Sequence, residues 1–152
     1  MRNIQIEASS SSIAYNGSPE KAVDGIWKNG VYGDPNYPSK VFCAHTSNEP
    51  SWIRVDLGEE FVVASLLFVG RNRDEGHPYH SKNWTIRISN TTDNNSGEIC
   101  ASNVDASGGY WVPITCNSKL TGRYATISSE NDMVLCEIQV LITNGKYLLF
   151  IK

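Results

Sequence analysis

Short segments in which apolar and polar residues alternate occur along most of this chain. Trp52–Leu57 reads Trp-Ile-Arg-Val-Asp-Leu, and Trp84–Ser89 reads Trp-Thr-Ile-Arg-Ile-Ser. A period of two is typical of antiparallel strands that have one buried and one solvated face. On this pattern we expect strands at Asn3–Glu7, Trp52–Leu57, Phe61–Gly70, Trp84–Ser89, Tyr110–Cys116, Gly122–Ser128 and Met133–Ile142.

Two segments depart from the strand pattern. Ser18–Gly25 begins with Ser-Pro and closes on glycine, which predicts one short helical turn. Ile26–His45 is rich in Gly, Pro, Asn and Tyr without a period, and it predicts a long ordered loop of the kind that usually serves function. With so little helix, the chain is predicted to be all-β: a single-domain antiparallel β-sandwich of the jelly-roll type. Residues 1–143 are expected to form the domain, and residues 144–152 a C-terminal tail.

Length and charge narrow the classes of partner. A chain of 152 residues is enough for one core. Its 13 basic and 16 acidic residues are scattered and give a net charge of -3, whereas phosphate binding needs a concentrated cationic face. The apolar run Phe61–Val69 is much shorter than the roughly 20 residues of a membrane-spanning helix. Nucleic acid is therefore not an expected partner, and a membrane is expected only indirectly.

Cysteines and glycosylation motifs point to an oxidising compartment. The four cysteines have no close metal-ligand spacing, so two disulfides are expected, in any of the possible pairings, among Cys43, Cys100, Cys116 and Cys136. N-glycosylation acceptor patterns begin at Asn16, Asn83, Asn90 and Asn94. Both features predict a secreted, extracellular protein.

Five motifs carry a resemblance to a known family. Lys21–Gly25 (Lys-Ala-Val-Asp-Gly), Trp52–Gly58 (Trp-Ile-Arg-Val-Asp-Leu-Gly) and Leu66–Arg71 (Leu-Leu-Phe-Val-Gly-Arg) resemble the discoidin or coagulation-factor C-domain superfamily. Cys43–His45 (Cys-Ala-His) and Leu135–Val140 (Leu-Cys-Glu-Ile-Gln-Val) are similar to its F-type (fucose-binding) lectin branch. This resemblance implies that residues 1–143 form a discoidin-like, F-type lectin-like domain with long ligand-binding loops, which recognises L-fucose-terminated glycans.

The resemblance also implies the sugar-binding residues. In F-type lectins fucose is held by a His, by an Arg in a later Arg-x-Asp motif and by a second Arg or Lys. His45 matches the first, and Arg71 follows it by 26 positions, at the spacing the family uses. The third element departs from the pattern, because Arg73 stands where Asp is expected and the adjacent cysteine pair is missing. The remaining polar contact is therefore expected from Arg73, His80 or Lys82, and a lectin with altered sugar specificity is an alternative.

These residue types suit a sugar. A hydroxyl both donates and accepts, and the fork of an arginine can bind two oxygens at once. Hydrogen bonds from charged donors contribute about 1.5–3 kcal/mol, against about 1 kcal/mol for neutral donors. An apolar wall for the methyl group and ring face of fucose is expected from Tyr37, Phe42 or Tyr79. Outside the family context, His45 would simply hydrogen-bond its own loop, and Arg71 would be solvated or ion-paired.

A structural calcium ion and a disulfide pairing are implied by the same resemblance. Asp24 and Glu137 match the family's carboxylate ligands. Calcium takes six to eight oxygens, and main-chain carbonyls would supply the others, from Lys21, Ile26, Phe42 and Cys136. The alternative is that Asp24 caps a turn and Glu137 is a surface residue. The family pattern pairs Cys43 with Cys136 and Cys100 with Cys116.

Rival functions are weaker on sequence grounds. Glycoside hydrolysis needs two carboxylates facing one bond, whereas Asp74 and Glu75 are adjacent, so no enzyme is predicted. His77 and His80 could suggest a zinc pair, but Pro78 argues against a helix that presents both. A discoidin-type module that binds phospholipid or a protein through residues 32–42 is the main alternative. The expected partners are fucosylated or related glycans on cell surfaces or glycoproteins, with avidity from oligomers or tandem domains.

Overall fold

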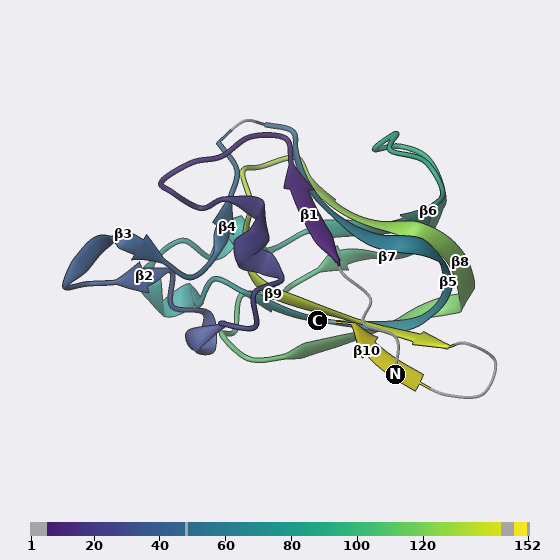
Figure 1. The fold of residues 1–152 in the computed structure, drawn as a ribbon. Helices are drawn as coiled ribbons and strands as arrows, with labels where there is room; N and C mark the ends of the chain where they lie inside the picture. The colour runs from purple at the N-terminus through teal and green to yellow at the C-terminus, as the bar shows by residue number, and fades with distance from the viewer. Residues whose placement is uncertain (1–5, 48, 144–147, 152) are drawn as a thin grey trace.

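Strands make up nearly all of the regular structure (Figure 1). The computed structural model describes residues 6–47, 49–143 and 148–151. Its strands are β1 (Glu7–Ser10), β2 (Gly33–Asp34), β3 (Tyr37–Val41), β4 (Ala44–His45), β5 (Ser51–Gly70), β6 (Trp84–Ser89), β7 (Glu98–Val104), β8 (Val112–Ser129), β9 (Val134–Thr143) and β10 (Leu148–Ile151). Four short 3-10 turns connect them: η1 (Pro19–Ala22), η2 (Lys28–Gly30), η3 (Arg73–Glu75) and η4 (Pro78–Ser81). No helix in the described ranges is long and apolar enough to cross a membrane.

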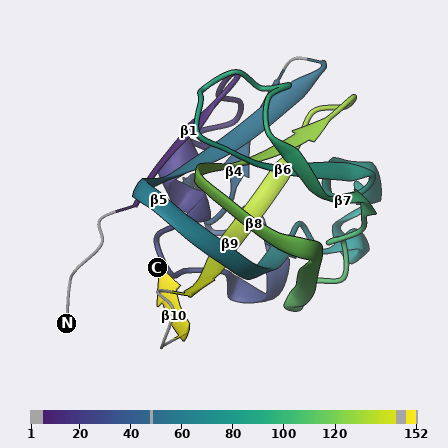
Figure 2. The same ribbon diagram turned by 90° about the vertical axis from the view of Figure 1, so that its right-hand side faces the viewer.

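Two long strands, β5 and β8, bend and take part in both layers of the sandwich (Figure 2). In one layer Ser51–Asp56 of β5 pairs with β1 and with the end of β8, which continues into β6 and β7. In the other layer Val62–Gly70 of β5 pairs with β9, which pairs with β10, and with the start of β8. The antiparallel β-sandwich is therefore confirmed.

The bend in β5 joins two segments that the sequence pattern predicts as separate strands, Trp52–Leu57 and Phe61–Gly70. The register with β8 shifts between Asp56 and Phe61. Gly58 lies there with a φ of 84°, a conformation that costs glycine little, and its N–H donates to Asp56 Oδ1 at 2.8 Å. The predicted strands Tyr110–Cys116 and Gly122–Ser128 likewise fall within the single strand β8. In both cases the residues are in strands, as predicted. The prediction is wrong in that each pair of segments forms one continuous strand.

The core lies between the two layers. Alternate residues of β5, Ile53, Val55 and Leu57, are fully buried, as the alternating pattern predicts. Trp84 is also fully buried and meets Phe68 from the other layer edge to face, with ring centroids 6.1 Å apart. Burying such a side chain contributes about 1.5–3 kcal/mol, so this core fixes the position of the loops at the ends of the strands.

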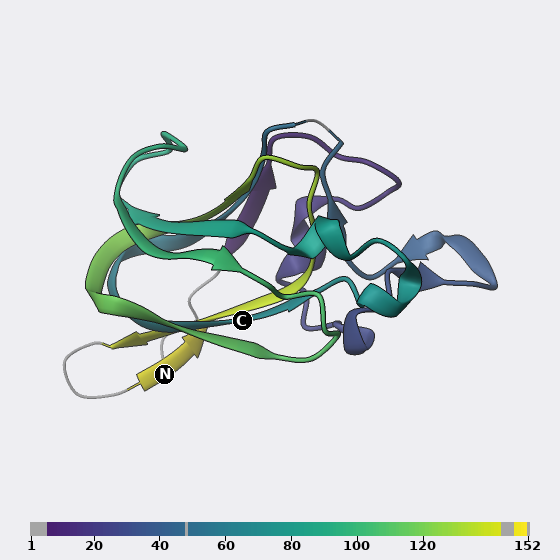
Figure 3. The same cartoon turned by 180° about the vertical axis from the view of Figure 1, so that it is seen from behind.

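The long segment 26–45 is ordered, as predicted, but it contains a hairpin. Strands β2 and β3 pair with each other and project from the sandwich on the same side as η3 and η4 (Figure 3). The following strand β4 pairs with β9, and the Cys43–Cys136 disulfide fastens the segment to β9. This arrangement brings segments far apart in sequence to one end of the domain.

Two further segments differ from the sequence pattern or lie partly outside the described residues. Strand β7 was not predicted, because four of its seven residues are exposed and its pattern is mostly polar. Of the predicted strand Asn3–Glu7, residues 3–5 lie outside the described residues, and β1 runs over Glu7–Ser10. Of the predicted tail 144–152, residues 148–151 pair with β9 as β10, while 144–147 and 152 are outside the described residues. The domain boundary at residue 143 stays a prediction.

Candidate functional site

A cavity of about 660 Å³ lies among the loops at the hairpin end of the domain. This volume is within the range of about 300–1,000 Å³ that small-molecule sites occupy. Its lining combines aromatic rings, two histidines that are buried, one arginine and several carboxylates, contributed by segments from Tyr15 to Asp132. Such a mixture suits a small polar ligand that has one apolar face.

His45 is held rigidly at the floor of this cavity. Its N–H donates to Gly17 O at 2.8 Å, and its carbonyl accepts from Ala14 N at 2.9 Å. The side chain is only 3% exposed, and its ring lies 5.2 Å from the ring of Tyr15 and 5.4 Å from that of Tyr32. A Cβ atom at Gly17 would lie 2.6 Å from His45 N, so this close approach requires glycine. His45 therefore hydrogen-bonds the neighbouring loop through its backbone, and not through its ring.

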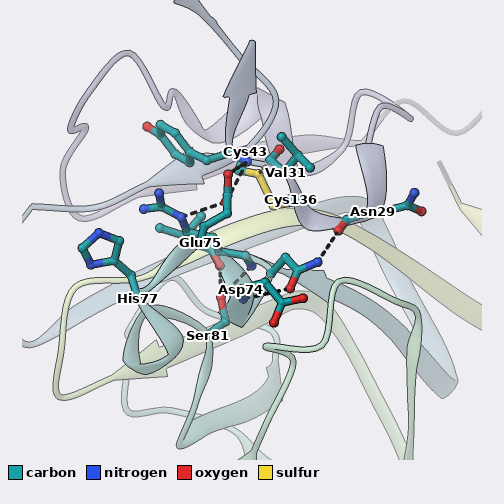
Figure 4. A network of polar contacts seen from close by, with 12 residues as sticks. Asn29, Val31, Cys43, Asp74, Glu75, His77, Ser81 and Cys136 are labelled. Atoms are coloured by element: carbon teal, nitrogen blue, oxygen red, sulfur yellow. Dashed lines mark hydrogen bonds and ion pairs between the residues drawn. A yellow bond between two sulfur atoms is a disulfide. The ribbon is translucent and has the colours of Figure 1, made fainter. Parts of the chain in front are cut away.

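Arg71 enters the cavity directly after β5. Its N–H donates to Ser81 Oγ at 2.8 Å, and its Nε donates to Glu75 Oε2 at 3.0 Å. The guanidinium lies 5.0 Å from the centre of the Tyr32 ring, and Glu75 also accepts from Tyr32 N (Figure 4). Because the ion pair uses Nε, the terminal nitrogens of the fork can still bind two oxygens.

His80 completes the polar floor together with Asp132. Its Nε2 lies 3.3 Å from Asp132 Oδ2, and Nε2 of His45 lies 3.6 Å from the same oxygen. The two imidazole rings are 5.1 Å apart. Burial lowers the pKa of His80 to about 4 and lowers the pKa of His45 as well, against the opposing effect of Asp132. Both rings are therefore neutral at physiological pH.

The structure brings four of the predicted sugar-site residues together and leaves three outside. His45, Arg71, Tyr79 and His80 line the cavity. Arg73 is exposed in η3, the ammonium of Lys82 lies 3.9 Å from Asp105 Oδ2, and Tyr37 is 64% exposed on β3; none of the three lines the cavity. Phe42, a candidate for the apolar wall, also lies outside it. Among the three candidates for the remaining polar contact, the cavity contains His80.

Several cavity residues were missed by the sequence reasoning. Tyr32 supplies an aromatic wall, and its hydroxyl donates to Tyr15 O at 2.9 Å. Asp132 lies in the turn before β9. An Asn-Asp pair before a strand is an ordinary turn signal, so the sequence offers nothing specific that would place Asp132 beside His45 and His80.

The two predicted carboxylate ligands of calcium come from β9, directly after Cys136, and from the turn that follows η1. Glu137 is fully buried in β9, and its Oε2 accepts from Gly25 N at 3.0 Å, which contradicts the alternative that Glu137 is a surface residue. Asp24 Oδ1 accepts from Ile26 N at 2.9 Å, so Asp24 caps this turn, as the other half of that alternative states. Its Oδ2 lies 4.0 Å from Lys21 Nζ, and burial raises the pKa of Asp24. Two carboxylates beside one turn, with carbonyls nearby, fit the oxygen-only preference of calcium.

Both disulfides have the pairing that the resemblance implies. Cys43 is bonded to Cys136, and Cys100 to Cys116. Phe42 precedes Cys43 in the sequence, and its side chain packs against the cluster that contains both bonded cysteines. The second bond joins β7, which pairs with β6 in one layer, to the start of β8 in the other layer. This pairing is confirmed, whereas the six calcium ligands remain predictions.

Comparison with known proteins bears on the family and the fold. The family model of the F5/8 type C domain matches residues 5–134. An F-lectin (fucolectin) from the serum of striped bass, Morone saxatilis, has a TM-score of 0.74 at 24% identity, covering 89% of this chain and 46% of the lectin. A fucose-binding module of Streptococcus pneumoniae has a TM-score of 0.66 at 26% identity, covering 91% and 92% of the two chains.

A third structure widens the range of sugars bound on this fold. The family 32 carbohydrate-binding module of Clostridium perfringens NanJ, solved with galactose, has a TM-score of 0.64 at 17% identity, covering 89% of this chain and 92% of the module. A search of the curated proteins gives no match. The chain spans less than half of the striped bass lectin. The predicted discoidin-like sandwich is confirmed by these structures.

Proposed function

Because this chain belongs to the F5/8 type C domain family, we propose that it is a lectin domain that binds L-fucose-terminated glycans in the cavity formed around His45 and Arg71. The observation that carries the proposal is the convergence of these two residues, 26 positions apart in sequence, in one aromatic cavity. The fucose-binding module of Streptococcus pneumoniae, similar over nearly its whole length, supports the choice of sugar.

Each cavity group has a distinct part in sugar binding. The terminal nitrogens of Arg71 donate to two neighbouring ring or hydroxyl oxygens, because the fork fixes their geometry. The neutral imidazole of His45 donates at one nitrogen and accepts at the other, as an axial hydroxyl requires. The rings of Tyr15, Tyr32 and Tyr79 line the same space and give the methyl group an apolar wall.

His80 makes this site different from one with two cations. His80 would take the part of the family's second Arg or Lys, so that one charged donor would be replaced by a neutral one. On general values this substitution weakens binding by about 0.5–2 kcal/mol. Fucose is therefore expected to bind more weakly than in a site with two cationic donors, and related sugars to compete better.

Calcium is proposed as the structural cofactor. The carboxylates of Asp24 and Glu137, with the carbonyls of Lys21, Ile26, Phe42 and Cys136, would hold it. An ion there supplies positive charge between the turn around Gly25 and β9, and it would keep the segment that ends in His45 in place. The burial of Glu137 and its contact with Gly25 N support this site.

The carboxylates near the cavity favour binding over catalysis. A glycosidase needs one carboxylic acid and one carboxylate facing the same bond. Three carboxylates line the cavity. Glu75 is held in an ion pair with Arg71, and Asp132 lies against two histidines. Asp34 accepts from Asn36 N in its own hairpin turn, so none of them is arranged as a free acid opposite a second carboxylate. The similar solved structures are likewise described as lectins or carbohydrate-binding modules.

We infer a secreted, extracellular setting from the two disulfides and the four glycosylation motifs. The partners would then be fucosylated or related glycans on cell surfaces or glycoproteins, and membranes would be reached through those glycans. A single cavity binds one sugar weakly, so oligomers or tandem domains would supply avidity. Nucleic acid is not a proposed partner, because the basic residues are scattered along the sequence and outnumbered by acidic ones.

A second candidate function rests on the projecting hairpin. Strands β2 and β3 extend away from the sandwich (Figure 1), and Tyr37 on β3 is 64% exposed. An exposed aromatic on a protruding hairpin could contact a phospholipid surface or a protein. A glycan array and a liposome sedimentation assay, run on the same protein, separate the two functions: glycan binding without sedimentation supports the lectin, and the reverse result supports the hairpin.

A further inference from the structure

We propose that His45, His80 and Asp132 bind a zinc-class transition metal ion at the floor of the cavity, and that this ion competes with the glycan. The two imidazoles and the carboxylate offer ligand atoms that all lie within 4.8 Å of one another. Two nitrogens and one oxygen favour zinc over calcium, which takes oxygen ligands. The metal site is inferred only from the contacts of His45, His80 and Asp132. The competition with the glycan rests, in addition, on the proposed function.

The distances from the two histidines to Asp132 match the ligand shell of zinc. Zinc holds nitrogen and oxygen ligands at about 2.0–2.1 Å in a tetrahedron, so neighbouring ligand atoms are about 3.3–3.4 Å apart. Nε2 of His80 and Nε2 of His45 lie 3.3 and 3.6 Å from Asp132 Oδ2. The second distance is too long for a hydrogen bond, and both distances fit atoms that share one ion.

The buried nitrogens of these histidines lack other partners. Nδ1 and Nε2 of His45 and Nδ1 of His80 make no hydrogen bond within the part of the chain that the structure describes. The two side chains are only 3% and 5% exposed. Buried polar atoms in native proteins are almost always satisfied. A metal ion beside Asp132 Oδ2 would give Nε2 of His45 the partner that it lacks.

The charges around the site are compatible with a cation. Arg71 lines the same cavity, and its guanidinium is paired with Glu75 at 3.0 Å. His77 stacks on His80 with ring centroids 5.2 Å apart, but it is not part of the triad. Three protein ligands leave a fourth position, which water or a ligand in the cavity can occupy.

Metal binding would regulate the sugar site because both use His45. Coordination takes the imidazole lone pair that would otherwise accept from a sugar hydroxyl. On sequence grounds a zinc pair would consist of His77 and His80, and Pro78 argues against that pair. The fold instead joins His80 to His45 of β4 and to Asp132 before β9, a combination that no local spacing contains.

Zinc titration in the absence of glycan tests the metal site directly. Tag-free protein, freed of transition metals and kept in calcium, is titrated with Zn²⁺ by calorimetry, and with Co²⁺ to record the visible absorption of tetrahedral coordination. The matched variants are His80→Gln, Asp132→Asn and His77→Gln, and the chain has three histidines in all. Circular dichroism and melting in calcium check that each variant folds.

We expect one Zn²⁺ per chain in the parent and in His77→Gln, and loss of that binding in His80→Gln and Asp132→Asn. Absence of Zn²⁺ binding in the parent would overturn the site, and so would binding that survives in both triad variants but is lost in His77→Gln. If His80→Gln does not fold, Asp132→Asn decides alone, because this carboxylate is 26% exposed and the change keeps its shape.

The competition has its own readout. A fucosylated oligosaccharide is titrated with and without saturating Zn²⁺, and the apparent Kd is expected to rise by the factor 1 + [Zn²⁺]/Kd for the metal in the parent protein. An unchanged Kd at saturating Zn²⁺ would overturn the competition. Zinc binding together with no glycan binding at all would overturn the proposed function while leaving the metal site in place.

Discussion

Oε2 of Glu75 lies 3.0 Å from Nε of Arg71, in an ion pair between the first residue after β5 and the end of η3. The same carboxylate accepts the N–H of Tyr32. Glu75 therefore holds Arg71, the charged donor, against the ring of Tyr32, and it also fixes the loop that carries Tyr32. The guanidinium is held in place before any sugar arrives, so little side-chain entropy is lost on binding.

Replacing Glu75 by glutamine is expected to weaken glycan binding about tenfold, because Arg71 loses its charged partner and becomes mobile. Calorimetry with a fucosylated oligosaccharide measures the change. Asp74→Asn is the control, since Asp74 is the exposed neighbour in the same turn. Equal affinity of Glu75→Gln and the parent would mean that the ion pair does not position Arg71.

His45→Ala and Arg71→Ala are each expected to abolish measurable fucose binding. Each change removes a polar contact in the floor or wall of the cavity that the remaining residues cannot supply. Arg73→Ala should bind like the parent, because Arg73 does not line the cavity. The affinity is measured by titration with free fucose and with a fucosylated oligosaccharide, on variants whose melting temperatures match that of the parent. Binding that persists in both cavity variants would contradict the site.

Chelation of calcium is expected to lower the melting temperature. An ion that binds only the folded chain stabilises it by RT ln(1 + [L]/Kd), about 2.7 kcal/mol at a hundred times Kd. Asp24→Asn should melt like the chelated parent and respond little to added calcium, whereas Glu20→Gln, an exposed change on the same turn, should keep the response. If Asp24→Asn gains as much from calcium as the parent does, the proposed ligands are wrong.

The ion pair at the bend of β5 should make stability depend on acid. Hydrogen bonds from Arg123, whose Nε is 2.7 Å from Asp56 Oδ1, lower the pKa of Asp56 in the folded chain. A lowered pKa stabilises the fold above the unfolded value of about 3.9, and this contribution is lost as the pH falls through the folded value. Asp56→Asn should therefore melt earlier than the parent at pH 7.

The difference between Asp56→Asn and the parent is expected to shrink steadily as the pH is lowered, and to vanish once Asp56 is protonated in both states. Thermal unfolding followed between pH 7 and about pH 2.5 tests this. A difference in melting temperature that stays constant over the whole range would show that Asp56 acts through packing or through the turn at Gly58, and that its charge is not involved.

Local pattern was sufficient for most of the strands and for part of the site. Alternation predicts β6 at its observed bounds, and it predicts both halves of β5. It cannot predict that β5 continues through Gly58, because a register shift between strands leaves no mark on the period of one strand. Strand β7 was missed for a related reason: its residues face mostly outward, so its position depends on pairing with β6.

The site divides in the same way. His45 and Arg71 follow from a family spacing, and His80 was one of three candidates until the turn η4 placed it in the cavity. Asp132 and Tyr32 have no local signal, because their place beside His45 depends on long-range contacts. The histidines also lie deeper than their loop-like sequence suggests. Burial lowers the pKa of both, so the unperturbed value near 6.5 does not describe them.

The pairing of β4 with β9 also affects when the cavity forms during folding. His45 and Val134 are partners in that short ladder, and the cavity floor combines residues from the first third, the middle and the last quarter of the chain. Contacts of such high sequence separation form late, since the loop entropy is lost before they contribute. We therefore expect that a chain fragment lacking β9 does not bind a glycan, so that glycan binding would report a completely folded domain.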